Sequence, residues 1–165
     1  MSRMEIAALA NLLETEELKI RGGKQDQYAA ACGGLSYMTF EDPEVTVEPL
    51  RPSRDFILEL EKSLLLVYTG KSRLSGDIIS TVMDAYLRNE AAMTEPLMNL
   101  RDAGHQMRDA IVDEDLVRVG EVLEWNWENQ KRLYDSMTTP KIEALMTMAR
   151  GEGVLGGKAC GAGGG

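Results

Sequence analysis

Two glycine pairs, Gly22-Gly23 and Gly33-Gly34, constrain the first third of the chain more than any other feature. Glycine ends helices and opens turns, so no helix or strand is expected to run through either pair. Before the first pair, residues 5–18 carry apolar side chains at helical spacing, which predicts a helix. Between the pairs, residues 25–32 have room for one short helix. The chain therefore opens with two helices separated by glycine.

The pattern changes after the second glycine pair. Residues 35–40 and 45–50 alternate as antiparallel strands do, and Glu41-Asp42-Pro43 supplies a turn between them. Residues 64–68, Leu-Leu-Leu-Val-Tyr, form a short apolar run that predicts a buried strand. A polar loop follows this run, and a helix is expected from about residue 75 to residue 88.

The second half of the chain has helical spacing throughout. One apolar stripe is Leu97, Leu100, Gly104, Met107 and Ile111, and another is Leu116, Val119, Leu123, Trp127 and Tyr134. A last helix is expected to start at a Thr139 cap with Pro140 in its first turn, and to end near Gly151 or Gly153. Together these features predict an α+β fold in which antiparallel strands pack with helices.

Charge and cysteine content exclude several classes of function. The 165 residues include 18 basic and 27 acidic side chains, and the net charge of −9 disfavours nucleic acid as a partner. The longest apolar run falls far short of the roughly 20 residues that span a bilayer, so no membrane segment is expected. Cys32, Cys160 and the single His105 suggest neither a disulfide framework nor a zinc site, which favours the cytoplasm.

Asp26 is the most informative acidic residue. It is expected near the start of a helix, where backbone N–H groups favour a carboxylate, and Lys24 adds positive charge nearby. A structural aspartate in a first helical turn has the same features, so position alone leaves its role open.

The string Gly-Gly-Lys-Gln-Asp-Gln-Tyr-Ala-Ala-Ala-Cys-Gly-Gly at residues 22–34 resembles the catalytic segment of the GHMP kinases, the galactokinase, homoserine kinase, mevalonate kinase and phosphomevalonate kinase family. It is most similar to family members that act on heptose phosphates. The resemblance implies that Asp26 orients or deprotonates the acceptor hydroxyl during transfer of the ATP γ-phosphoryl group. It also implies that Gly23, Lys24 and Gln25 line the substrate site.

The same resemblance implies a magnesium ligand. Family members place a magnesium-binding glutamate roughly a dozen residues before the catalytic aspartate, which selects Glu14 over Glu16 and Glu17. A solvated acidic helix face is the alternative for all three. Magnesium held by one or two carboxylates together with phosphate oxygens suits this ion, so the expected cofactors are ATP and Mg²⁺.

Two further segments resemble parts of the family. Thr69-Gly70-Lys71-Ser72 imitates a Walker A ending, but the pattern needs a glycine where Leu65 stands, which rejects a P-loop. Lys71 and Arg73 resemble a loop of heptose-phosphate kinases and would contact the sugar phosphate, unless they are solvated loop charges. The tail resembles the family's third glycine-rich segment, which implies that it supports the nucleotide loop through Gly161, Ala162, Gly163 and Gly164. Without the family it would be read as a disordered tail.

The resemblance covers nearly the whole chain but lacks the family's first segment and its phosphate-binding loop. We therefore expect a chain truncated at both ends, with residues 1–50 ending an N-terminal domain and 51–165 forming a C-terminal domain without its last strand. Such a chain should expose apolar surface from Ile6, Leu9 and Leu13 and be inactive alone.

The expected function is ATP-dependent phosphorylation of a heptose phosphate or related sugar at the anomeric hydroxyl. The alternatives are a kinase for another sugar, such as fucose or galactose, and a non-catalytic remnant that binds a metabolite or a protein. The expected partner is a small-molecule sugar phosphate, and a second copy of the chain is a further candidate.

Overall fold

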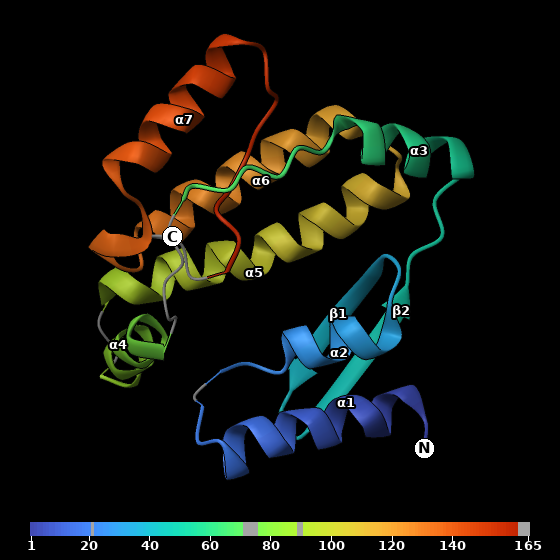
Figure 1. The fold of residues 1–165 in the computed structure, drawn as a ribbon, viewed down its shortest axis with the longest axis vertical. Helices are drawn as coiled ribbons and strands as arrows, with labels where there is room; N and C mark the ends of the chain where they lie inside the picture. The colour runs from blue at the N-terminus through green and yellow to red at the C-terminus, as the bar shows by residue number, and fades with distance from the viewer. Residues whose placement is uncertain (21, 71–75, 89–90, 162–165) are drawn as a thin grey trace. The chain divides into compact units, whose positions relative to one another are not determined.

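The computed structural model describes residues 1–20, 22–70, 76–88 and 91–161. The chain divides into two compact units, Met1–Arg51 and Pro52–Gly165, which are described separately (Figure 1). Helices and a two-stranded antiparallel sheet make up the described residues, which confirms the predicted α+β class. The assignment of residues 1–50 and 51–165 to two kinase domains stays a prediction.

The unit Met1–Arg51 consists of two helices and a hairpin. Its elements are α1 (Arg3–Leu12), a π-helical turn (Leu13–Glu17), α2 (Gln25–Cys32), β1 (Ser36–Glu41) and β2 (Glu44–Pro49). The Ser2 hydroxyl accepts from the Glu5 amide and the Glu5 carboxylate accepts from the Ser2 amide, so a capping box starts α1. The Tyr28 ring meets the Phe40 ring edge to face at 6.1 Å, which packs α2 on the hairpin.

Both helices and both strands of this unit lie close to where the sequence predicts them. The hairpin pairs Ser36 with Pro49 and Glu41 with Glu44, and its turn contains a cis peptide bond before Pro43. The side chains of Ile6, Leu9 and Leu13 are 45%, 41% and 49% exposed, which confirms that apolar surface. Few of the unit's described side chains are therefore buried.

The unit Pro52–Gly165 is helical in its described part. Its elements are α3 (Arg54–Ser63), α4 (Gly76–Leu87), α5 (Ala91–Val112), α6 (Leu116–Lys131), a 3₁₀ turn (Asp135–Met137) and α7 (Pro140–Gly151). Helices α5 and α6 lie side by side (Figure 1). On these two helices, the buried apolar side chains, with less than a tenth of their surface exposed, are Ala103, Ala110, Ile111, Val119, Val122 and Trp127. Three of them, Ile111, Val119 and Trp127, belong to the two predicted apolar stripes.

The predicted buried strand at residues 64–68 is wrong. These residues belong to no helix or strand, and Leu65, Leu66 and Tyr68 are 85%, 83% and 77% exposed. A strand needs a neighbouring strand for its backbone hydrogen bonds, and the sheet of the described residues pairs only β1 with β2. The sequence reading also missed α3, which begins at a Ser53 cap and buries Phe56 and Leu60 four residues apart.

The end of the chain follows the prediction for α7 closely. The Thr139 hydroxyl caps the helix, Pro140 is its first residue and Gly153 takes a positive φ of 87° just beyond its end. The chain then runs back across α6 as far as Gly161 (Figure 1). Over the described residues, no helix combines the length and apolarity that crossing a membrane requires.

Candidate active site

Asp26 is the second residue of α2 and its side chain is exposed. It lies in the first helical turn, where the unpaired backbone N–H groups favour an anion. The residue at the N-cap of α2 is Lys24, whose side chain makes no capping bond. Asp26 is thus a solvent-accessible carboxylate at a helix start, as the sequence predicts.

The structure brings Glu14 beside the helix that carries Asp26. The Gln27 side-chain amide of α2 donates a short hydrogen bond to Oε2 of Glu14, which follows α1 in the chain. Glu14 lies in the π-helical turn Leu13–Glu17, a form often found at functional sites. The predicted metal ligand and the predicted catalytic residue are therefore linked through a single intervening side chain.

Gln27 was not among the residues singled out from the sequence. Its position directly after Asp26 was the only sequence feature that could have indicated a role in the site. A neutral glutamine at that position is not a typical catalytic or metal-binding residue. Its Oε1 atom is buried and without a hydrogen-bond partner, and so is Nδ2 of Asn11, one helical turn before Glu14. Buried polar atoms usually have partners, so these two atoms mark positions in this unit where buried polar groups are not fully satisfied.

The side chain of Lys24 forms an ion pair with the hairpin β1–β2. Its Nζ lies 2.5 Å from Oδ1 of Asp42, in the turn between β1 and β2. Gly23 and Gln25, on either side of Lys24, are exposed. This ion pair ties the start of α2 to the hairpin turn, and the assignment of these three residues to substrate binding stays a prediction.

The other two acidic candidates of the first helix match the solvated reading. Glu16 and Glu17 are exposed, and Glu16 lies 3.6 Å from Nζ of Lys19. Among the described residues, no three His, Cys, Asp or Glu side chains gather closely enough to hold a metal ion by themselves. Glu14 is the one of the three whose carboxylate contacts α2.

The remaining predicted residues belong to Pro52–Gly165. Lys71, Arg73, Ala162, Gly163 and Gly164 lie outside the described residues. Just before the first of them, the Thr69 carbonyl accepts a short hydrogen bond from Nζ of Lys141, a cation that the sequence reading did not single out.

Gly161, the first residue of the predicted nucleotide-supporting segment, is described. Its carbonyl accepts a 2.8 Å hydrogen bond from the side-chain amide of Gln130 on α6. Burial lowers the pKa of nearby Lys158, although the Cys160 side chain opposes that shift. The segment is thus packed against the helical unit up to the last described residue.

The class of protein follows from comparison with known families. Residues 107–165, which span the end of α5, all of α6 and α7 and the returning tail, match the family described as GHMP kinases C terminal. The chain is therefore related to the GHMP kinases, as the resemblance of residues 22–34 indicates.

Particular relatives extend the likeness to the whole chain. It is 31% identical to a D-glycero-α-D-manno-heptose 7-phosphate kinase of Campylobacter jejuni, with 100% of this chain and 48% of that protein covered. It is 28% identical to a bifunctional fucokinase/GDP-fucose pyrophosphorylase of Arabidopsis thaliana, with 99% and 16% covered. The chain thus spans about half or less of the curated relatives that it matches.

A solved structure shares the fold. The crystal structure of a D-glycero-D-manno-heptose 1-phosphate kinase from Bacteroides thetaiotaomicron matches with a TM-score of 0.69 and 29% identity. The match covers 99% of this chain and 43% of that one. The α+β fold described above is therefore that of a stretch within a sugar kinase.

Proposed function

We propose that this chain is part of an ATP-dependent sugar kinase that phosphorylates a heptose phosphate or a related sugar at its anomeric hydroxyl. The observation that carries the proposal is the contact of Glu14 with Gln27, next to Asp26. It supports an arrangement in which Asp26 and Glu14 act together in phosphoryl transfer, in a chain whose relatives are named as sugar kinases.

Each carboxylate would have its own task. Asp26, exposed at the start of α2, would accept a hydrogen bond from the acceptor hydroxyl and orient it or take its proton. Glu14 would be the protein ligand of Mg²⁺, which neutralises charge on the ATP phosphates. Gln27 fits this role for Glu14, because its N–H group occupies Oε2 and leaves the other carboxylate oxygen to the cation.

The sugar is proposed from the relatives. Two are named for heptose phosphates, which supports a phosphorylated heptose. Others are named as fucokinases, so an unphosphorylated sugar such as fucose is the second candidate. Lys71 and Arg73 would favour the phosphorylated sugar, because two cations two residues apart in the sequence suit a phosphate group.

The setting of the reaction is also proposed. ATP and a sugar phosphate are small, water-soluble metabolites, so we place the protein in the cytoplasm. A net charge of −9 argues against nucleic acid as a partner. A non-catalytic remnant that binds the sugar phosphate without turnover is the alternative from a different class.

The decisive experiment replaces Asp26 with asparagine, which keeps size but removes the charge. The chain would be joined to the part of the Campylobacter jejuni relative that it does not span, and assayed with ATP, Mg²⁺ and heptose 7-phosphate. We expect kcat to fall by about 10²-fold or more, with little change in the KM for ATP or in Tm. Without that addition the chain should show no turnover, because the phosphate-binding loop is not among its residues.

Asp55→Asn is the matched control for Asp26→Asn. Asp55 is also the second residue of a helix, α3, and is also exposed. It should leave kcat unchanged. Near-normal turnover in Asp26→Asn would remove Asp26 from the chemistry, and binding of the sugar phosphate without turnover in the unmutated protein would favour the remnant.

A further inference from the structure

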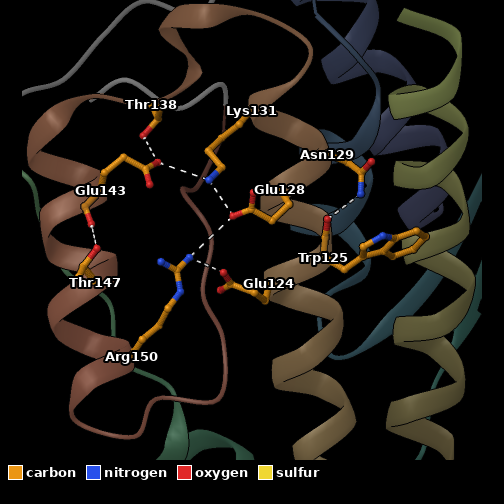
Figure 2. Close-up of polar contacts among 9 residues, drawn as sticks. All are labelled: Glu124, Trp125, Glu128, Asn129, Lys131, Thr138, Glu143, Thr147 and Arg150. Carbon is orange, nitrogen blue, oxygen red and sulfur yellow. Dashed lines mark hydrogen bonds and ion pairs between the residues drawn. The ribbon is translucent and has the colours of Figure 1, made fainter. Parts of the chain in front are cut away.

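Residues 154–158, which follow α7, lie between two helices. A Cβ atom on Gly156 would come within 1.9 Å of the Gly120 carbonyl oxygen, and one on Gly120 within 2.4 Å of Cβ of Leu155. On the other side, a Cβ on Gly157 would lie 3.3 Å from the sulfur of Met146 in α7. The segment 154–158 is therefore in close contact with α6 and adjoins α7, as Figure 2 shows.

Charged side chains join the two helices across this segment (Figure 2). Arg150, near the end of α7, makes a short ion pair with Glu124 and lies 3.8 Å from Glu128, both on α6. Lys131 of α6 lies 2.7 Å from Glu128 and 3.7 Å from Glu143, near the start of α7. Both ends of α7 are thus tied to α6 by ion pairs, with the segment 154–158 between the helices.

An uncharged contact holds the segment farther along. Gln130 is only 9% exposed, and its amide donates to the Gly161 carbonyl. A buried amide without a partner would be costly, so this bond favours one position of the segment. Gly161 has a φ of 64°, a conformation that suits glycine and that this bond helps to hold.

We propose that Arg150 and Gln130 are positioning residues for the C-terminal segment, with Arg150 acting as a salt-sensitive latch that closes α7 over residues 154–158. This inference rests on the ion pairs and the hydrogen bond described above, and it does not depend on the proposed function.

The two contacts should respond differently to salt. The Arg150 guanidinium and the Glu124 and Glu128 carboxylates are partly exposed, so added salt screens their attraction. The Gln130 bond joins neutral groups, so salt should affect it little. Ionic strength therefore separates the latch from the buried bond.

The test measures how often the segment opens. A lysine-specific endoprotease can cut after half-buried Lys158 only when the segment leaves its place, and the cut releases the peptide 159–165, detected by mass spectrometry. In the full chain at low salt, Arg150→Gln should raise the rate of release about three- to fivefold. Arg101→Gln, which breaks a pair with its neighbour Asp102 on α5, is the matched control and should leave the rate unchanged.

A rise in salt from about 0.05 to 0.5 M should speed release from the unmutated chain by a similar factor. The effect on Arg150→Gln should be smaller, because only the Lys131 pairs with Glu128 and Glu143 remain to be screened. Gln130→Met should speed release at both salt concentrations, with Gln106→Met, on the exposed face of α5, as its control.

All release rates are corrected for the effect of salt on the protease, measured with a free peptide substrate. Equal rates for Arg150→Gln and the unmutated chain, or salt-independent release from the latter, would overturn the latch. An unchanged rate in Gln130→Met would overturn the second positioning role.

Discussion

The two units of the chain differ in how they are held together. In Met1–Arg51 the buried apolar side chains of the described residues are Ala7 and Tyr28, and polar contacts such as Lys24 with Asp42 join the elements. In Pro52–Gly165 many more apolar side chains are buried, among them Trp127, which is fully buried. Asp26 and Glu14, the proposed catalytic and metal-binding residues, therefore belong to Met1–Arg51, which we call the polar unit. Most of the buried apolar side chains belong to Pro52–Gly165, the helical unit.

This difference predicts which substitutions lower the free energy of unfolding most and in which unit they lie. Apolar burial is the largest stabilising contribution in a folded domain, so the helical unit should dominate the free energy of unfolding. A small unit with few buried side chains leaves its polar groups accessible to a ligand at the expense of its own stability.

Trp127→Ala should have the largest effect. The side chain is fully buried in the described structure, and removing it leaves a cavity beside α6. We expect a loss of about 3–5 kcal/mol in the free energy of unfolding, measured by urea titration. Tyr28→Ala in the polar unit should cost less, about 2 kcal/mol. Equal losses would break the comparison between the units.

Gly120→Ala tests the close contact between α6 and the returning segment. The new methyl group would lie 2.4 Å from Cβ of Leu155, so the backbone must shift. We expect a loss of about 1–3 kcal/mol. Gly104→Ala in α5 meets nothing within 4 Å and should instead stabilise by about 0.5–1 kcal/mol, because alanine favours a helix. Thermal unfolding that shifts both variants in the same direction would contradict the contact.

Helix caps sharpen the comparison, because a cap acts locally whatever core lies beneath it. Ser2 caps α1 in the polar unit and Asp115 caps α6 in the helical unit, each accepting from a backbone amide. Ser2→Ala and Asp115→Ala should each cost about 1 kcal/mol. A much larger loss for Asp115→Ala in denaturant titrations would mean that it supports more than its helix.

The smallest expected effect depends on pH. The Glu114 carboxylate accepts hydrogen bonds from the amide and hydroxyl of Ser53, which lower its pKa. Because the folded pKa lies below the unfolded value of about 4.3, this contribution is present above that pH and is lost as the pH falls through the folded pKa. Glu114→Gln should flatten the dependence of Tm on pH in that acidic range. An unchanged dependence would show that Ser53 does not stabilise the charged form.

The sequence predicted helices better than anything else. Helical spacing and caps located α1, α2, α6 and α7, because these signals are local. The apolar run 64–68 has the composition of a strand, but a strand also depends on a partner that no local pattern reveals. The link from Glu14 to Gln27 was missed for a similar reason. It joins two helices through a neutral side chain, which neither charge nor periodicity singles out.

The exposed run 64–68 has a consequence for the chain in a crowded cell. Consecutive exposed apolar side chains outside any helix or strand are the type of segment that other chains can join by strand addition, the first step toward aggregates. Lys62 stands before the run and Lys71 after it. Charged residues at both ends of such a run act as gatekeepers, since two copies aligned in register must bring like charges together. The lysines flanking this run are therefore expected to slow self-association.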